Sequence, residues 1–209
     1  MNIKVCGITT LKQLQQLDGL NADFAGLIFY KESPRYMGEK LEASLIKGSD
    51  FDLKKVGVFV NPEMIDVLDA ITNYGLDAVQ LHGNETPEMC DDLSSEVEVI
   101  KAFSINSDTS NIDELVDSYD GVCDYYMFDN RPIEGYGGSG EKFDWKLIAD
   151  SKIEKPFFLS GGIGPDDYSL VKAFKHPDFF GVDLNSLFEK EPGVKDMAQI
   201  LKFMHGLKK

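Results

Sequence analysis

Two side chains in this sequence have the chemistry of a proton-transfer pair. Cys6 ends an apolar segment near the N-terminus, and Asp129 ends another in the middle of the chain. A thiolate can take a proton from carbon, and a carboxylic acid can give one to a leaving oxygen. A helix expected after Gly7 would favour the Cys6 thiolate and bring its pKa towards neutrality. The apolar run before Asp129 would favour its neutral acid. The two residues therefore predict general acid–base chemistry.

Three more polar residues follow or end apolar segments. Arg35 carries a planar guanidinium that can hold a carboxylate through two parallel hydrogen bonds, although the same residue is common as a solvated surface charge. His82 is either a hydrogen-bonded wall residue or a further catalyst, and both readings stay open. Asp183 lies in the last apolar segment. Reactive groups that recur at several segment ends indicate an active site better than any one of them alone.

Small residues after the last two apolar segments predict a phosphate site. Gly161-Gly162 follows one segment and Asn185-Ser186 follows the other. Glycine lets the main chain approach an oxyanion closely. Backbone N–H groups can then hold a phosphate without a Lys or Arg side chain.

These residues can meet only if the secondary structure brings the segment ends together. Short apolar stretches alternate with amphipathic stretches of helical length, which is typical of a parallel sheet covered by helices. Asn61-Pro62 and Thr86-Pro87 are favourable helix starts. The expected strands are Ile3–Cys6, Phe24–Phe29, Lys55–Val60, Ala78–His82, Val97–Phe103, Asp124–Asp129, Pro156–Ser160 and Phe179–Leu184. The expected helices are Thr9–Leu17, Glu39–Lys47, Pro62–Asn73, Pro87–Leu93, Ile112–Ser118, Asp144–Ala149, Asp166–Phe174 and Lys195–Phe203.

Eight such units of about 26 residues account for the 209 residues of the chain. Eight units close a (β/α)8 barrel, or TIM barrel, whereas a flavodoxin-like sheet needs only five strands. We therefore predict an α/β protein in which residues 1–209 form a single eight-stranded parallel barrel domain. An open doubly wound sheet is the alternative. In a barrel, the active site lies at the carboxyl ends of the strands, where the reactive residues are expected.

The composition limits the partners of the protein. The chain has 21 Lys and Arg against 36 Asp and Glu, a net charge of −15. This charge argues against a broad nucleic-acid or anionic-membrane surface. Three cysteines without a C-x-x-C pair favour a reducing compartment, and neither a signal peptide nor a membrane-length apolar run is apparent. We expect a cytoplasmic protein that binds no nucleic acid and no membrane.

Neither a cofactor nor a metal ion is expected. Gly135–Gly140 fits the spacing G-x-G-x-x-G, but about five residues separate it from the preceding strand and no acidic residue ends the next one, unlike a dinucleotide site. A glycine-rich loop, typical of a lid, is the better interpretation. The three histidines, His82, His176 and His205, form no pair with the spacing of metal ligands.

Several blocks of the sequence, taken together, match one known family. They are Lys4–Thr9, Ser33–Tyr36, Val56–Asn61, Val79–Gly83, Asp129 with Gly137–Gly140, Phe143–Trp145, Leu159–Gly162 and Pro192–Asp196. In this order they resemble the phosphoribosylanthranilate isomerases of tryptophan biosynthesis, and they run from residue 4 to residue 196. Leu187 departs from the pattern, since the family often has Gly there, which bears on how closely the backbone approaches a phosphate.

The resemblance implies an Amadori rearrangement. N-(5-phosphoribosyl)anthranilate, an aminoaldose, becomes 1-(2-carboxyphenylamino)-1-deoxyribulose 5-phosphate, an aminoketose. By this resemblance Cys6 is the general base, Asp129 the general acid, and Arg35 the group that binds the anthranilate carboxylate. The full set of expected substrate-binding residues is Arg35, His82, Gly161, Gly162, Asp183, Asn185 and Ser186. The resemblance implies no cofactor, and family members occur as monomers and homodimers.

Other functions stay open beside this one. Another phosphosugar barrel is one alternative, although the histidine-pathway isomerase typically uses two aspartates and the pentose-phosphate epimerase depends on a metal site. A non-catalytic barrel that serves as a scaffold is another. Intact Cys6, Asp129 and Arg35 favour an active enzyme.

Strand alternation predicts one contact beyond the family pattern. If Cys6 points into the barrel mouth, Lys4 points inward as well, at a deeper level. A buried ammonium needs a partner. We therefore expect Lys4 to pair with Asp129 or with Asp183.

Overall fold

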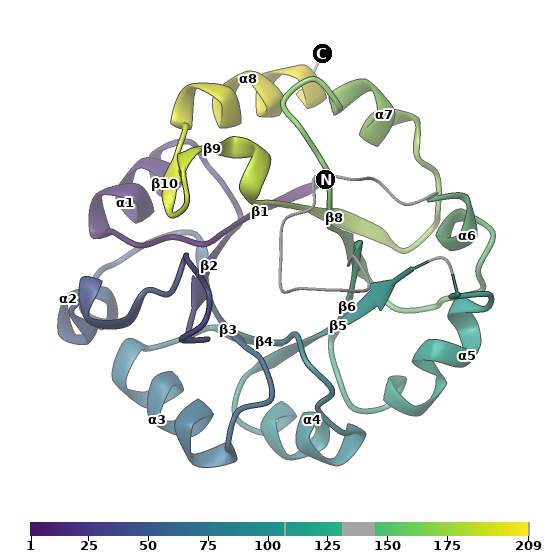
Figure 1. Ribbon diagram of the computed structural model, residues 1–209, viewed down its shortest axis with the longest axis horizontal. Helices are drawn as coiled ribbons and strands as arrows, with labels where there is room; N and C mark the ends of the chain where they lie inside the picture. Colours follow the sequence, from purple (N-terminus) through teal and green to yellow (C-terminus); the bar gives the residue numbers. More distant parts are fainter. Residues whose placement is uncertain (107, 131–144, 209) are drawn as a thin grey trace.

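The fold is a closed barrel of eight parallel strands, as the sequence predicts. The computed structural model describes residues 1–106, 108–130 and 145–208. The barrel strands are β1 (Asn2–Cys6), β2 (Phe24–Ile28), β3 (Lys54–Phe59), β4 (Ala78–Leu81), β5 (Glu98–Ile105), β6 (Tyr125–Asn130), β7 (Phe157–Leu159) and β8 (Phe179–Leu184). Each strand pairs with the next, and β8 closes the ring on β1 (Figure 1). The open-sheet alternative is therefore wrong.

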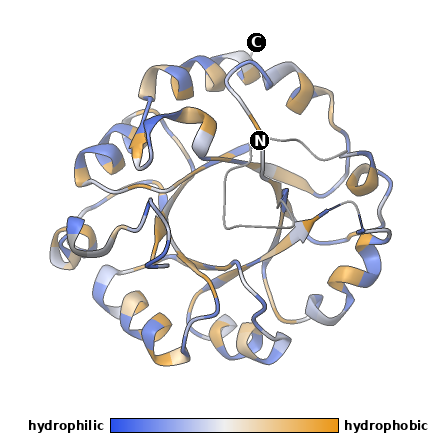
Figure 2. Ribbon diagram, in the orientation of Figure 1, coloured by the Kyte–Doolittle hydropathy of each residue, from blue (hydrophilic) through white to orange (hydrophobic). Residues whose placement is uncertain are grey.

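Helices surround the barrel on its outside (Figure 1). They are α1 (Leu11–Gly19), α2 (Ala43–Lys47), α3 (Met64–Tyr74), α4 (Pro87–Ser94), α5 (Ile112–Val116), α6 (Lys146–Ala149), α7 (Tyr168–Ala173) and α8 (Met197–Lys208). Short 3-10 turns occur at η1 (Gly38–Lys40), η2 (Asp117–Tyr119) and η3 (Ser186–Phe188). Each outer helix carries both hydrophobic and hydrophilic residues (Figure 2), because one side of it packs on the sheet and the other meets water.

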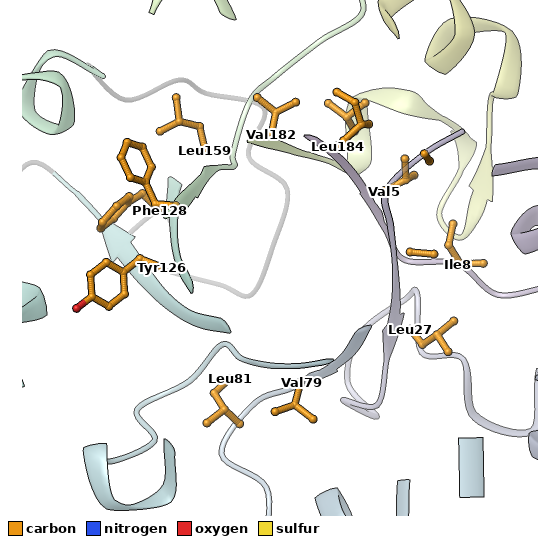
Figure 3. Close-up of a cluster of buried hydrophobic side chains, with 14 of the residues drawn as sticks. Val5, Ile8, Leu27, Val79, Leu81, Tyr126, Phe128, Leu159, Val182 and Leu184 are labelled. Carbon is orange, nitrogen blue, oxygen red and sulfur yellow. The ribbon is translucent and has the colours of Figure 1, made fainter. Parts of the chain in front are cut away.

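Side chains alternate between the inside and the outside of the barrel wall. Val5, Leu27 and Leu159 lie on the outer side, in the apolar layer under the helices (Figure 3). Phe24 and Phe158 belong to a second cluster of fully or almost fully buried residues inside the barrel, where their rings meet edge to face with centroids 5.4 Å apart. The interior is therefore filled by side chains, and the space for a ligand lies above them at the mouth.

Two predicted helix starts have different outcomes. Thr86 accepts a hydrogen bond from the backbone N–H of Met89, and Pro87 opens α4 as expected. Asn61 does not cap a helix, because its φ of 46° lies in the left-handed region, whereas a capping residue is extended. The Asn61 side chain instead accepts the backbone N–H of Asn84 at 2.7 Å, and α3 begins at Met64.

The sequence missed a β-hairpin before the last helix. The expected helix Lys195–Phe203 begins only at Met197. The residues before it form β9 (Glu189–Glu191) and β10 (Val194–Lys195), an antiparallel pair. Gly193 makes the turn with a φ of 82°, a conformation that glycine adopts at little cost.

Two other expectations on helices need adjustment. The expected helix Glu39–Lys47 is interrupted at extended Leu41, so it splits into η1 and α2. The helix expected over Asp144–Ala149 spans Lys146–Ala149 in the part of the chain that the structure describes. The predicted glycine-rich loop at Gly135–Gly140 lies outside the described residues. Among the helices that the structure describes, none has the length and apolar character needed to cross a membrane.

The inner aromatic cluster makes the first testable prediction. Phe158 is fully buried and lies between the rings of Phe24 and Phe180. We expect Phe158→Ala to lower the free energy of unfolding by about 3–5 kcal/mol, because it leaves a cavity where three rings meet. Denaturant titration followed by circular dichroism measures the loss. Leu170→Ala, at a side chain that is 46% exposed on α7, should cost well under about 1 kcal/mol. Equal losses for the two variants would contradict the assigned packing.

Candidate active site

A pocket opens at the carboxyl ends of the strands, and every site residue expected from the sequence lies on it. These residues are Cys6, Arg35, His82, Asp129, Gly161, Gly162, Asp183, Asn185 and Ser186. The structure adds lining residues that sequence reasoning did not name as part of the site. They are Ile28, Tyr30, Ser33, Pro34, Val58, Val60, Gln80, Asn130, Ser160 and Ile163. Apolar side chains among them form the walls, and the polar groups converge on the space between.

A buried ion pair forms the floor of the pocket. The Lys4 ammonium donates to an Asp183 carboxylate oxygen at 2.9 Å, and the two side chains are 0% and 5% exposed. The expectation that Lys4 has a buried carboxylate partner is confirmed, and the partner is Asp183. The Ser160 hydroxyl donates to the other Asp183 oxygen at 3.4 Å. Although burial disfavours the ammonium, Asp183 and Cys6 raise the pKa of Lys4 above its usual value.

Cys6 lies on this floor as a buried thiol. Burial raises the pKa of Cys6 above its ordinary value, and Asp183 acts in the same direction. Lys4 and Lys195 oppose this rise without cancelling it. The expectation that a helix N-terminus would bring the Cys6 pKa towards neutrality is therefore wrong, because burial dominates and α1 begins only at Leu11.

Asp129 is held at the opposite side of the pocket by His82. The two side chains meet at 3.2 Å between the Asp129 Oδ2 and His82 Nε2 atoms. The other ring nitrogen, Nδ1, lies 2.8 Å from the Gln80 side-chain nitrogen. With the Gln80 amide oriented so that it donates, Nδ1 accepts, and the ring hydrogen lies on Nε2, facing Asp129. His82 is thus a wall residue that contacts the predicted general acid.

Gly161 is required by close packing against Asp129. A Cβ atom at Gly161 would lie 2.7 Å from the Asp129 Oδ1 atom, and its φ of 81° is unfavourable for other residues. Gly162 follows with a φ of 67°. This backbone therefore leaves room for the carboxylate of Asp129 on one side of the turn.

Arg35 has a partner within the protein that the sequence did not reveal. Its Nε and Nη2 groups donate to the carboxylate of Glu189 at 2.8–3.0 Å. Lys195 donates to the same carboxylate at 2.7 Å. Although burial opposes its charged form, these two cations lower the pKa of Glu189 below its usual value. The residues lie 154 positions apart, so only the fold could show this contact.

Leu187 does not occupy the pocket. It lies in η3 after the Asn185-Ser186 turn, and its side chain is 40% exposed. It is absent from the residues that line the pocket. In the predicted phosphate turn, Asn185 and Ser186 therefore line the pocket, and Leu187 does not.

A second buried ion pair supports the loop that carries His82. Glu85 and Lys101 meet at 3.0 Å, with side chains 1% and 3% exposed. Lys101 donates to the carbonyl oxygens of Leu81 and Gly83, on either side of His82. Glu85 accepts the backbone N–H of Gly83. The pair thus fixes the backbone from which His82 reaches Asp129.

Within the described residues, no group of three or more His, Cys, Asp or Glu side chains is arranged to hold a metal ion.

Comparison with known proteins gives a consistent result. The chain matches the family model of N-(5'-phosphoribosyl)anthranilate (PRA) isomerase over residues 3–206. A protein of Parabacteroides distasonis named N-(5'-phosphoribosyl)anthranilate isomerase is 42% identical over 206 residues, which cover 98% of this chain and 92% of that one.

Two solved structures share the whole fold. Phosphoribosyl anthranilate isomerase from Thermotoga maritima is 33% identical with a TM-score of 0.84, covering 100% of this chain and 98% of that one. A phosphoribosyl anthranilate isomerase in complex with reduced 1-(o-carboxyphenylamino)-1-deoxyribulose 5-phosphate is 30% identical with a TM-score of 0.79, over the same shares of the two chains.

The buried pair beneath the His82 loop makes a prediction on stability. We expect Lys101→Met to lower the free energy of unfolding by about 3–5 kcal/mol, because Glu85 would remain buried without its cation. Thermal and denaturant unfolding at neutral pH measure the loss. The control is Lys54→Met, which breaks the exposed pair with Glu98 (side chains 41% and 34% exposed) and should cost about 1 kcal/mol or less. A Lys101→Met protein as stable as the control variant would show that the buried pair of Glu85 and Lys101 does not stabilise the fold.

Proposed function

The chain belongs to the N-(5'-phosphoribosyl)anthranilate isomerase family, and we propose that Cys6 and Asp129 are the base and the acid of its reaction. The enzyme isomerises N-(5'-phosphoribosyl)anthranilate to 1-(2-carboxyphenylamino)-1-deoxyribulose 5-phosphate, a step of tryptophan biosynthesis. The observation that carries the assignment is that a thiol and a carboxyl group from β1 and β6 line one pocket at the barrel mouth.

The reaction needs one proton donor and one proton acceptor. Asp129 gives a proton to the furanose ring oxygen, the ring bond at C1' breaks, and the anthranilate nitrogen forms a Schiff base with that carbon. This Schiff base acidifies the C2' hydrogen, which the Cys6 thiolate removes as a proton. The resulting enolamine takes up a proton at C1' and loses the proton of its C2' hydroxyl, which gives the ketone. Electrons only move within the substrate, so two positioned groups are enough for the proton transfers.

The high pKa of Cys6 has two opposing consequences for its role as a base. Only a small fraction of the thiol is ionised at neutral pH, because burial raises its pKa. The thiolate that does form is a stronger base than one with a lower pKa. Lys4 lies beside it and favours the ionised form. The rate at which Cys6 removes a proton from carbon therefore depends on both its ionised fraction and its strength as a base.

The two anionic ends of the substrate need separate binding groups. We assign the anthranilate carboxylate to Arg35, whose guanidinium has five N–H groups and uses its Nε and Nη2 atoms on Glu189. We assign the phosphate to the backbone N–H groups of the turns at Gly161-Gly162 and Asn185-Ser186. The complex of a relative with a reduced product analogue that carries a phosphate supports a phosphorylated ligand in this family. His82 and Asp183 are the remaining polar groups on the pocket that we expect to contact the sugar.

Because the pocket draws on strands from β1 to β8, we also propose that residues 1–209 act as a single barrel domain.

Substitution of the two proposed catalytic groups tests these roles. We expect Cys6→Ala and Asp129→Asn each to lower kcat by about 10²–10⁴-fold, the usual contribution of a general acid or base. The measurement follows the loss of phosphoribosylanthranilate fluorescence. The matched controls are Cys90→Ala, at a buried cysteine of α4, and Asp124→Asn, at the other end of β6. Both controls should keep kcat within about threefold of the unsubstituted enzyme. If Cys6→Ala or Asp129→Asn behaves like its control, that residue is not the acid or base.

The pH dependence tests the state of Cys6 in the free enzyme. The base must be a thiolate, and burial raises its folded-state pKa above the usual range of a thiol, so the active fraction increases as pH rises through that raised value. We therefore expect log kcat/KM to increase with a slope near one to beyond about pH 8.5, the ordinary pKa of a thiol. Cys6→Asp, with a base that is ionised at neutral pH, should abolish this alkaline rise. A plateau of the unsubstituted enzyme already reached at pH 7 would contradict the role of a thiol with a raised pKa.

A further inference from the structure

Glu189 lies between the two regions that are assigned to the ends of the substrate. Its side chain is 4% exposed. It accepts hydrogen bonds from Arg35, from Lys195 and from the backbone N–H of Gly193 at 3.1 Å. We propose that Glu189 is a positioning residue that fixes Arg35 for the carboxylate and, through Lys195, fixes the Asn185 turn for the phosphate. This inference rests on the proposed roles of Arg35 and of that turn.

On one side, Glu189 orders the guanidinium of Arg35. The carboxylate receives both Nε and Nη2 of Arg35, a paired geometry that defines the plane of the guanidinium. The Arg35 chain passes directly over Gly7, where an added Cβ would lie 2.8 Å from the Arg35 Cδ atom. Arg35 is only 12% exposed as a result. The guanidinium is therefore held in one orientation before a ligand arrives, and the ligand does not have to order it.

On the other side, Lys195 links Glu189 to the Asn185 turn. The Lys195 ammonium is fully buried. Besides Glu189, it donates to the Asn185 side-chain oxygen at 2.8 Å and to the Asn185 backbone oxygen at 3.3 Å. An ammonium has three hydrogens, and these three contacts can use all of them. Asn185 has an uncommon backbone conformation, with φ −141° and ψ −103°, so a fixed partner on both of its oxygens holds the turn in shape.

The hairpin that carries Glu189 and Lys195 is itself anchored to the loop after Cys6. The backbone oxygen of Gly193, at the hairpin turn, accepts hydrogen bonds from the Thr9 hydroxyl at 2.7 Å and from the Gln13 side chain at 2.9 Å. β9 and β10 therefore cannot shift without breaking contacts to the first β/α unit. The Glu189 carboxylate is therefore held in a fixed position relative to both ends of the pocket.

The cluster of Arg35, Glu189 and Lys195 also carries a favourable local charge. Two cations and one carboxylate give a sum of +1 in a chain whose net charge is −15. Without Glu189, the buried Lys195 and the largely buried Arg35 would repel each other, and both would lose their common partner. Glu189 thus keeps the two cations together beside the place where an anionic ligand is expected.

The test measures each end of the pocket with its own probe. The probes are anthranilate and inorganic phosphate, each titrated as a competitive inhibitor of the purified enzyme. We expect Glu189→Gln to weaken both probes by at least about tenfold, because the neutral amide cannot hold two cations. Arg35→Ala should weaken anthranilate with little effect on phosphate, and Lys195→Met should weaken phosphate more than anthranilate. Glu191→Gln is the matched control, since Glu191 lies on the same strand with an exposed side chain, and it should bind both probes as the unsubstituted enzyme does.

The double variant decides whether Glu189 acts through Arg35. In the Arg35→Ala background, adding Glu189→Gln should not weaken anthranilate further, while it should still weaken phosphate. Glu189→Asp, which keeps the charge, should recover part of the affinity for both probes, and this recovery distinguishes positioning from a general loss of structure. Circular dichroism and thermal unfolding identify any variant that does not fold. If Glu189→Gln does not fold, Glu189→Asp replaces it, and its affinity for both probes should lie below that of the unsubstituted enzyme.

Different failures have different meanings. If Arg35→Ala leaves anthranilate binding unchanged, the proposed role of Arg35 is wrong, and the inference built on it is wrong too. If Arg35→Ala weakens anthranilate but folded Glu189→Gln binds both probes within threefold of the unsubstituted enzyme, only the inference on Glu189 is overturned. An effect of Glu189→Gln on a single probe would overturn the link between the two ends.

Discussion

The ion pair between Lys4 and Asp183 joins the first and the last strand of the barrel directly beneath the pocket. Lys4 is fully buried, and an ammonium in such a place is tolerated only with a close anionic partner. The strand register sets Lys4 opposite Asp183. The last paired residues of the two strands are Val5 and Leu184. Cys6 and Asn185 come next at the carboxyl ends of these neighbouring strands, and both line the pocket. The pairing of β1 with β8 thus brings the proposed base and the proposed phosphate turn to the same end of the barrel.

The same arrangement determines the character of Cys6. Its thiol is surrounded by the barrel floor, so burial and Asp183 favour the neutral form, while Lys4 and Lys195 favour the thiolate. Burial is the largest of these effects. Two lysines that serve structural ion pairs therefore also moderate the pKa of the thiol. A stronger base removes a proton from carbon more readily, but only the ionised fraction of the thiol can act, so both effects set the rate of this step.

The sequence was sufficient for the barrel and for most of the rim, and the reason is geometric. Parallel strands in a barrel leave their carboxyl ends on one face, so residues that follow apolar segments, such as Asp129 and Gly161, had to come together. Contacts between polar residues outside the eight barrel strands could not be predicted in this way. Glu189 and Lys195 lie in a short charged stretch without strand alternation, and their partner Arg35 is remote in the chain. The pKa of Cys6 was missed for a related reason, because burial depends on the whole barrel and not on the neighbouring residues.

An acidic protein can bind a ligand with two anionic groups because its surface carboxylates and its pocket cations act over different distances. Carboxylates such as Glu88, Asp91 and Asp92 are exposed on the outer helix α4, where salt screens their field within about 8–10 Å. The cations near the pocket, Lys195 among them, are buried, and screening reduces buried interactions much less. The field at the barrel mouth is therefore set by a few groups held within hydrogen-bond distance, and backbone N–H groups add to it without any net charge. The net charge of the chain therefore does not indicate the charge of its ligand. The local cluster of Arg35, Glu189 and Lys195 that the fold assembles does indicate it.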